Sequence, residues 1–254
     1  MLVQVGENLL LLGFLLLIFA NIPPLLHFQK TRKLTPKFNF EIEDNLLPQV
    51  TVILPVRNES KNMQPKLKEI SEFEYPSGKM TLIVADSLSD DGTAEIAEEF
   101  FQNMGDIKCR LISIEEPGKS RAINTALEFS KSDLVVIMDS DASCNPDCLR
   151  RLASVLVQDD IGAVCGMISD SAVSSQVAYR SRFNEIRLGE SDLDSTPIFE
   201  GSIYGFKISS LEGLRISETN NADDSQVAIM VRSNGFRALM CNKIPIIENT
   251  SIVS

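Results

Sequence analysis

Histidine and tryptophan are nearly absent from this chain of 254 residues, which contains one histidine and no tryptophan. The histidine, His27, lies in the N-terminal segment, so acid–base chemistry elsewhere in the chain depends on carboxylates. Cysteine is also scarce, with five residues at scattered positions and no histidine beside them. This set predicts free thiols in a reducing compartment and argues against zinc sites and disulfide frameworks.

Positive charge is in deficit, because 24 lysine and arginine residues face 35 aspartate and glutamate residues, for a net charge of −11. This balance argues against a nucleic-acid partner. A phosphate-bearing ligand would meet a repulsive field unless local cations or a metal ion offset it. The chain is 44% hydrophobic and 23% charged, as in globular proteins, and its length can bury a substantial core.

One long apolar run, LLLLGFLLLIFANIPPLL, occupies residues 9–26. Its 18 residues are at the lower limit of what a helix needs to cross a bilayer. Pro23 and Pro24 predict a kink or an interfacial finish near its end. A signal peptide and a buried soluble helix are the alternatives, but a signal peptide would have basic residues before the run. We therefore expect a membrane anchor.

Three cations, Lys30, Arg32 and Lys33, follow the run. By the positive-inside rule they would hold the downstream domain in the cytoplasm. We expect residues 1–34 to form the anchor with its basic juxtamembrane segment, and the polar residues 35–48 to form a linker.

Apolar runs and helical patterns alternate after this linker. The predicted strands are 50–56 (VTVILPV), 80–85 (MTLIVA), 110–114 (RLISI), 134–138 (LVVIM) and 163–168 (AVCGMI), and the predicted helices are 92–103, 119–130 and 146–157. Pro146 suits a first helical position, with Asn145 as its cap. The alternation predicts an α/β fold with a parallel sheet.

Polar side chains follow several of these strands. The first strand is followed by Arg57-Asn58-Glu59, the second by Asp86-Ser87 and the fourth by Asp139-Ser140-Asp141. Ligands of open parallel sheets bind beyond the carboxyl ends of the strands, so these residues are candidates for a binding site. For Asp90 and Asp91, turn formation and helix capping are sufficient explanations.

Asp139 and Asp141 form the most specific feature of the sequence. At alternate positions after a buried strand, both carboxylates can face one cation. Carboxylate oxygens suit Mg²⁺ or Mn²⁺, which would bridge diphosphate oxygens and stabilise the charge on a departing nucleoside diphosphate. A plain turn is the alternative, because Asp-x-Asp alone often occurs by chance.

Several segments together resemble the family 2 inverting glycosyltransferases in order and spacing. They are PVRNES (55–60), ADSLSDDGT (85–93), PGKSRAIN (117–124), IMDSDA (137–142) and NADDSQVAIMVRSNGF (221–236). The resemblance covers roughly residues 50–240 and implies a GT-A fold, with a mostly parallel central sheet flanked by helices, a nucleotide-sugar donor and a divalent metal. Residues 49–254 would form this domain, with a nucleotide-binding half at 49–142 and an acceptor and catalytic half at 143–254.

The resemblance also implies roles for individual residues. Pro55, Val56, Asn58 and Glu59 would line the nucleotide pocket, Asp86 would bind the base or ribose, Lys119 and Arg121 would lie near the donor, Asp139 would reach the donor sugar or ribose, and Asp141 would bind the metal. Asp139 and Asp141 together are our expected metal ligands. Lys119 and Arg121 are equally well explained as exposed cations on a first helical turn.

Asp223 and Asp224 open a predicted helix that Gly235 ends. Acidic residues are also ordinary helix caps at such positions. The resembling family carries Glu-Asp here, and its second member is the general base. Because histidine is not available, Asp224 is our candidate base, although Asp223 departs from the family pattern.

Two segments between these motifs are less specific. Residues 200–205 read as a Gly-containing strand, either shaping the acceptor side as in the family or simply bulged. Residues 169–197 read as an exposed helix followed by a loop. The arginines of this helix, Arg180, Arg182 and Arg187, either contact a lipid phosphate or belong to a salt-bridged surface, which we favour.

The leading hypothesis is an inverting transfer from a nucleotide sugar to an acceptor, lipid-linked or a glycan precursor, at the cytoplasmic face of a membrane. A nucleotidyltransferase and a non-catalytic scaffold are the alternatives. The first would carry a Gly-rich phosphate loop where this chain has Pro-Val-Arg-Asn-Glu. Processive synthases of the family carry a Gln-x-x-Arg-Trp segment that this chain lacks, so a single transfer and a longer native C-terminus both stay open.

Overall fold

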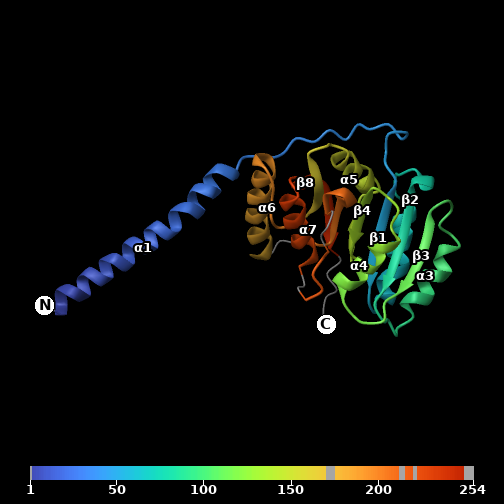
Figure 1. Cartoon of the computed structure of the whole chain (residues 1–254), viewed down its shortest axis with the longest axis horizontal. Helices are drawn as coiled ribbons and strands as arrows, with labels where there is room; N and C mark the ends of the chain where they lie inside the picture. The colour runs from blue at the N-terminus through green and yellow to red at the C-terminus, as the bar shows by residue number, and fades with distance from the viewer. Residues whose placement is uncertain (1, 170–174, 212–214, 220–221, 249–254) are drawn as a thin grey trace.

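A computed structural model describes residues 2–169, 175–211, 215–219 and 222–248. The N-terminal helix α1 (Leu2–Thr31) extends away from an α/β domain (Figure 1). Its part from Leu11 to Thr31 contains an 18-residue window with a mean hydropathy of 2.0 and no buried residue, so it is long and apolar enough to cross a membrane. Pro23 and Pro24 lie inside the helix, which continues past them to Thr31.

The C-terminal end of α1 packs against α6 (Ser175–Leu193). Thr31 is fully buried there, and His27 Nε2 lies 2.8 Å from Glu190 Oε1. Gly189 permits the contact, because a Cβ at this position would lie 2.2 Å from the carbonyl oxygen of Thr31. The contact joins the helix directly to the domain.

The segment at 35–48, predicted as a linker, lies along the domain surface as an extended chain (Figure 1). Phe38, Phe40 and Ile42 pack against the core. The ammonium group of Lys79 donates hydrogen bonds to three of its carbonyl groups, at 2.7 to 3.0 Å. The segment is therefore bound to the domain along much of its length.

Eight strands form one sheet in the order β3-β2-β1-β4-β7-β6-β8-β5. Their bounds are β1 (Val50–Val56), β2 (Met80–Asp86), β3 (Lys108–Ser113), β4 (Leu134–Met138), β5 (Ala142–Cys144), β6 (Ile161–Ile168), β7 (Ile203–Lys207) and β8 (Arg237–Glu248). The pairs among β3, β2, β1 and β4 are parallel, as is β6 with β8. The predicted mostly parallel sheet is confirmed, although β7 runs antiparallel to both neighbours.

Helices cover both faces of the sheet. They are α2 (Ser60–Ser71), α3 (Thr93–Phe101), α4 (Lys119–Phe129), α5 (Cys148–Leu156) and α7 (Asp223–Ser233), with 3₁₀ turns at Ser77–Lys79 and Ile208–Leu211. Val52 and Leu54 face the core that contains α2, α3 and α5, whereas Ile53 faces the core that contains α4, α6 and α7. This two-sided burial explains the continuous apolar run of β1.

One predicted helix starts later than expected, and one helix of the structure was not predicted. The helix expected at 146–157 begins at Cys148 with Asp147 as its N-cap, because a turn closed by the Cys148 N–H and the Asn145 carbonyl precedes it. Pro146 lies in this turn and not in the helix. Helix α2 was not predicted, since Pro65 interrupts its sequence pattern.

We expect Gly189→Ala to separate the end of α1 from α6, because the added methyl group would meet backbone atoms of Thr31. Overpacking of this kind costs about 1–3 kcal/mol, which corresponds to exchange about fivefold to 150-fold faster at amides near Thr31. Hydrogen exchange of the full chain in detergent micelles measures this. Gly13→Ala is the control, since its Cβ would meet nothing within 4 Å; equal exchange in both variants would contradict the expectation.

Candidate functional site

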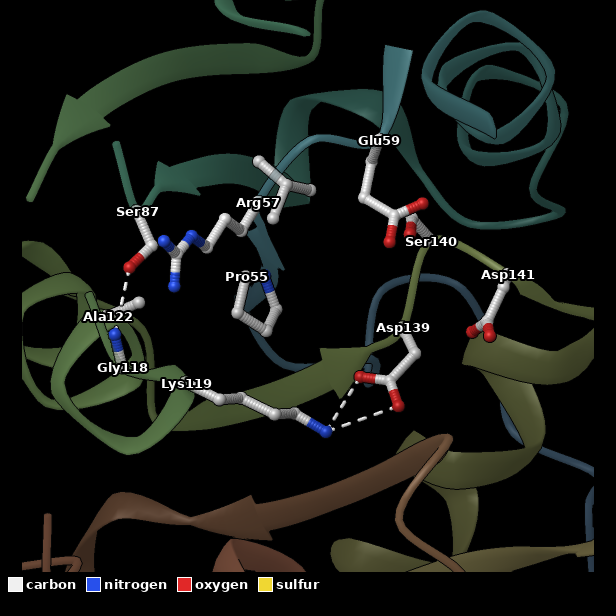
Figure 2. A pocket seen from close by; sticks show the side chains of 11 residues that line it. Pro55, Arg57, Glu59, Ser87, Gly118, Lys119, Ala122, Asp139, Ser140 and Asp141 are labelled. Atoms are coloured by element: carbon white, nitrogen blue, oxygen red, sulfur yellow. Dashed lines mark hydrogen bonds and ion pairs between the residues drawn. The ribbon is translucent and has the colours of Figure 1, made fainter. Parts of the chain in front are cut away.

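A cavity of about 370 Å³ opens at the carboxyl ends of β1, β2 and β4 (Figure 2). Its lining residues are Pro55, Val56, Arg57, Glu59, Ser87, Gly118, Lys119, Ala122, Asp139, Ser140 and Asp141. Six of the residues predicted from the sequence are among them: Pro55, Val56, Glu59, Lys119, Asp139 and Asp141. The cavity lies where an open sheet binds its ligands.

Hydrogen bonds join the turn after β1 to the turn after β2 and hold both turns in place. Asn58 has a left-handed backbone (φ 56°), which asparagine tolerates better than most residues. Its N–H donates to Ser89 Oγ at 2.9 Å, and its side-chain oxygen accepts the N–H of Asp90 at 3.0 Å. Asp86 is buried and accepts hydrogen bonds from the N–H and hydroxyl of Ser89. Asn58 and Asp86, predicted to contact the nucleotide, hold the turns and are not among the lining residues.

Asp91 caps two helices at once. Its carboxylate accepts the N–H groups of Ser60 at 3.0 Å and Thr93 at 3.1 Å, at the starts of α2 and α3. The hydroxyl of Thr93 also donates to it, and this bond, with the backbone N–H of Ser60, lowers the pKa of Asp91 well below its usual value. The predicted capping role is confirmed for Asp91.

Lys119 lies between two acidic side chains at the inner end of the cavity. Its Nζ is 2.8 and 3.1 Å from the carboxylate oxygens of Asp139 and 3.8 Å from Asp223 Oδ1. Figure 2 shows Lys119 reaching across to Asp139. Burial works against the charged ammonium, but the negative charges of Asp139 and Asp223 outweigh it and raise the pKa of Lys119. Lys119 therefore joins the first turns of α4 and α7 to the end of β4.

Asp139 has a raised pKa although Lys119 lies beside it. Burial raises the pKa of Asp139 to about 6, the charges of Asp141 and Asp223 add to the rise, and Lys119 opposes it. Among the described residues, no group of three or more His, Cys, Asp or Glu side chains could hold a metal by itself. Two carboxylates nonetheless suit Mg²⁺ or Mn²⁺, which use one or two carboxylates and take further ligands from substrate phosphates. Asp139 and Asp141, which both line the cavity, are by donor type the kind of ligands that such an ion uses.

Asp223 is buried and has two partners besides its own helix. The hydroxyl of Tyr204 on β7 donates to Asp223 Oδ2 at 2.6 Å. Burial raises the pKa of Tyr204 well above its ordinary value, and the charge of Asp223 adds to the rise, so this hydroxyl stays protonated. Sequence reasoning missed Tyr204, because the contact exists only once β7 and α7 are packed together.

Asp224 lies beside this cluster, against Gly201. A Cβ at Gly201 would lie 3.1 Å from Asp224 Oδ2, so the glycine leaves room for the carboxylate. Burial raises the pKa of Asp224, the neighbouring Asp223 adds to the rise, and the backbone N–H of Ser225 opposes it. A carboxylate with a raised pKa accepts a proton more readily than an ordinary one.

Arg121 does not line the cavity, although it was predicted to lie near the donor. Its guanidinium donates to Glu218 at 2.9 Å and to Glu116. Residues two apart on a helix point in different directions, so Lys119 and Arg121 cannot both face the cavity. Arg121 instead ties the segment before α7 to α4.

Two arginines of α6 form ion pairs. Arg180 lies 3.1 Å from Glu248, and Arg187 pairs with Glu200 next to Gly201. The Arg180–Glu248 pair agrees with the favoured interpretation of a salt-bridged surface, whereas the side chains of Arg187 and Glu200 are mostly withdrawn from solvent.

Comparison with known proteins gives a consistent result. The family described as Glycosyl transferase family 2 matches residues 51–234. Glycosyltransferase AglE of Haloferax volcanii is 34% identical over 122 residues, which are 48% of this chain and 40% of that protein. An N-acetylglucosaminyltransferase of Rhizobium meliloti is 26% identical over 213 residues, 77% of this chain and 50% of that protein. The chain thus spans half or less of the length of these two relatives.

Among solved structures, a mannosyltransferase from Pyrobaculum calidifontis, PcManGT in complex with GDP-Man and Mn²⁺, has a TM-score of 0.80 at 30% identity. The match covers 91% of this chain and 66% of that one. TarS of S. aureus has a TM-score of 0.63 at 16% identity, covering 80% of this chain and 37% of that one, and supports the fold alone. The predicted GT-A fold is confirmed.

We expect Tyr204→Phe to destabilise the domain more than Tyr75→Phe. Both hydroxyls donate at 2.6 Å, but Tyr204 donates to the buried carboxylate of Asp223 and Tyr75 to the carbonyl of Pro48. Hydrogen bonds to charged groups contribute about 1.5–3 kcal/mol and neutral ones about 0.5–1.5 kcal/mol. Urea unfolding of both variants measures the difference, and equal losses would show that Asp223 does not depend on Tyr204.

Proposed function

The chain belongs to glycosyl transferase family 2, and from this premise we propose that it transfers a sugar from a nucleotide-sugar donor with inversion at the anomeric carbon. The observation that carries the proposal is the convergence of Asp139, Lys119, Asp223 and Asp224 beside the cavity at the strand ends. The proposed base would thereby lie next to the proposed donor site. PcManGT, which has the same fold, holds GDP-Man and Mn²⁺.

We assign the donor to this cavity. Pro55, Val56 and Glu59 would line the nucleotide-binding wall, and Asn58 and Asp86 would support that wall through their turns. Lys119 supplies a positive charge next to the acidic side chains, where a diphosphate would otherwise be repelled. Arg121 would act on this site only indirectly, by holding the segment before α7.

Asp139 and Asp141 would hold Mg²⁺ or Mn²⁺. The carboxylate of Asp139 would then interact with two positive charges, the ion and the ammonium group of Lys119. When bound, the ion would stabilise the negative charge on the departing nucleoside diphosphate. Both residues line the cavity to which we assign the donor, so an ion held there would lie within reach of its diphosphate.

Asp224 is the proposed general base. The acceptor hydroxyl oxygen would attack the anomeric carbon from the side opposite the diphosphate and give its proton to Asp224. The new bond joins the acceptor oxygen to the anomeric carbon, and the bond from that carbon to the diphosphate oxygen breaks. Asp223, held by Lys119 and Tyr204, would keep the first turn of α7 in place.

The acceptor is proposed to be lipid-linked and reached at the cytoplasmic face. Helix α1 is long and apolar enough to cross a bilayer, and its end is fixed to α6, so an anchor would keep the site near a membrane. One similar protein, in Nostoc sp., is a beta-monoglucosyldiacylglycerol synthase, 27% identical over 119 residues, 46% of this chain and 25% of that protein. Equal transfer to lipid and soluble acceptors after deletion of α1 would argue against this acceptor.

We expect Asp224→Asn to lower transfer by about 10²–10⁴-fold, the range that general base catalysis contributes, while donor binding persists. A screen of nucleoside diphosphate sugars for Mn²⁺-dependent thermal stabilisation identifies the donor, and product formation measures transfer. Asp192→Asn, at an exposed position, is the control. If Asp224→Asn transferred sugar as fast as the control, Asp224 would not be the general base.

Transfer should also depend on pH through Asp224. Its pKa is raised above the ordinary 3.8, so the protonated, inactive form persists to higher pH than for an exposed carboxylate. The rate should fall as the pH drops through this raised pKa and level off above it. A pH profile of kcat checks this, and Asp224→Asn should lack the same acidic limb.

A further inference from the structure

Lys66 on α2 has a fully buried side chain, which is rare for lysine unless its charge is paired. Its Nζ donates to the carbonyl oxygen of Ala142 and lies 3.4 and 3.5 Å from the carboxylate oxygens of Glu69. Glu69 in turn accepts the backbone N–H of Cys144 at 3.0 Å. The two side chains therefore bind both ends of the short strand β5.

Strand β5 needs such support because it is the last strand of the sheet and only three residues long. It pairs with β8 on one edge. The Ala142 carbonyl and the Cys144 N–H are two residues apart on one strand and so point to the same edge. Lys66 supplies a donor there and Glu69 an acceptor, as a neighbouring strand would.

This support reaches the acidic turn directly, since Ala142 follows Asp141. The turn begins where the Asp139 N–H donates to the Ser202 carbonyl at 2.8 Å, and it ends where the Ala142 N–H approaches the Asp139 carbonyl at 3.4 Å. The first end is held by the central sheet. The second end is held by Ala142, whose carbonyl binds Lys66.

We propose that Lys66 and Glu69 are positioning residues that set the affinity of the Asp139–Asp141 turn for a divalent cation. The inference rests on the proposed metal site. A buried ion pair adds little net stability over apolar side chains of similar volume, so its contribution here is the geometry it imposes on β5. Groups that orient metal ligands without touching the ion typically change metal affinity when they are removed.

The test is a titration of the full chain in detergent micelles with Mn²⁺ alone, followed by electron paramagnetic resonance of the free ion. Lys66→Met keeps the volume and removes the donor, and we expect the dissociation constant to rise about 10–100-fold, the range for lost outer-shell partners. Glu69→Leu removes the acceptor for Cys144 and should act in the same direction. Glu69→Gln keeps an acceptor oxygen and should stay near the parent value.

The matched control is Lys68→Met on the same helix, where the lysine is 70% exposed and 3.9 Å from Glu72. It should leave the dissociation constant unchanged. The proposal would be overturned if Lys66→Met or Glu69→Leu lowered the melting temperature but bound Mn²⁺ as tightly as the parent protein does. The pair would then only stabilise the fold. Where Lys66→Met does not fold, the comparison of Glu69→Leu with Glu69→Gln decides.

The parent protein separates the two levels of inference. If the parent binds Mn²⁺ and all of these variants bind it equally well, the positioning role is overturned but the metal site is not. Absence of Mn²⁺ binding by the parent overturns the metal assignment and, with it, the role of Lys66 and Glu69. Transfer activity is not needed for either outcome.

Discussion

Close to the mouth of the sheet, one ammonium group lies among carboxylates that would otherwise repel each other. Lys119 contacts Asp139 at the end of β4 and Asp223 at the start of α7, and both acids are partly or fully withdrawn from water. Charges at such separations interact more strongly away from bulk water, so this contact holds together segments far apart in the sequence. Burial raises the pKa of Asp139 in spite of this contact, and the charges of Asp141 and Asp223 add to the rise.

The antiparallel strand β7 explains how α7 reaches the site. It lies between β4 and β6 in the sheet, so Tyr204 is beside β4, the strand that Asp139 follows. From there Tyr204 donates to Asp223, and Gly201, two residues before β7, leaves room for Asp224. Asp223, and with it the first turn of α7 that carries the proposed base, is thus bound to a strand of the sheet.

The supporting contacts lie around the site and not in it. Asn58, Asp86 and Asp91 hold the turns after β1 and β2, and Lys66 with Glu69 holds β5. The N-terminal helix α1, which packs on α6, adds a further constraint, because α6 carries Arg187, the partner of Glu200. A rigid arrangement of this kind suits a reaction that depends on placing a donor, a cation and a base within a few ångströms of one another.

Much of this followed from the sequence. Continuous apolar runs predicted β1 and β4 to the residue, because strands buried on both faces leave no alternation. The apolar run near the N-terminus predicted a helix, and the acids after β4 predicted where the cavity would open. Only the tertiary structure decided which cations face that cavity, since Lys119 and Arg121 are indistinguishable by composition but point in different directions on one helix. It also decided the partners of Tyr204 and Lys66, because a hydroxyl or a buried ammonium finds its acceptor only when distant strands and helices pack together.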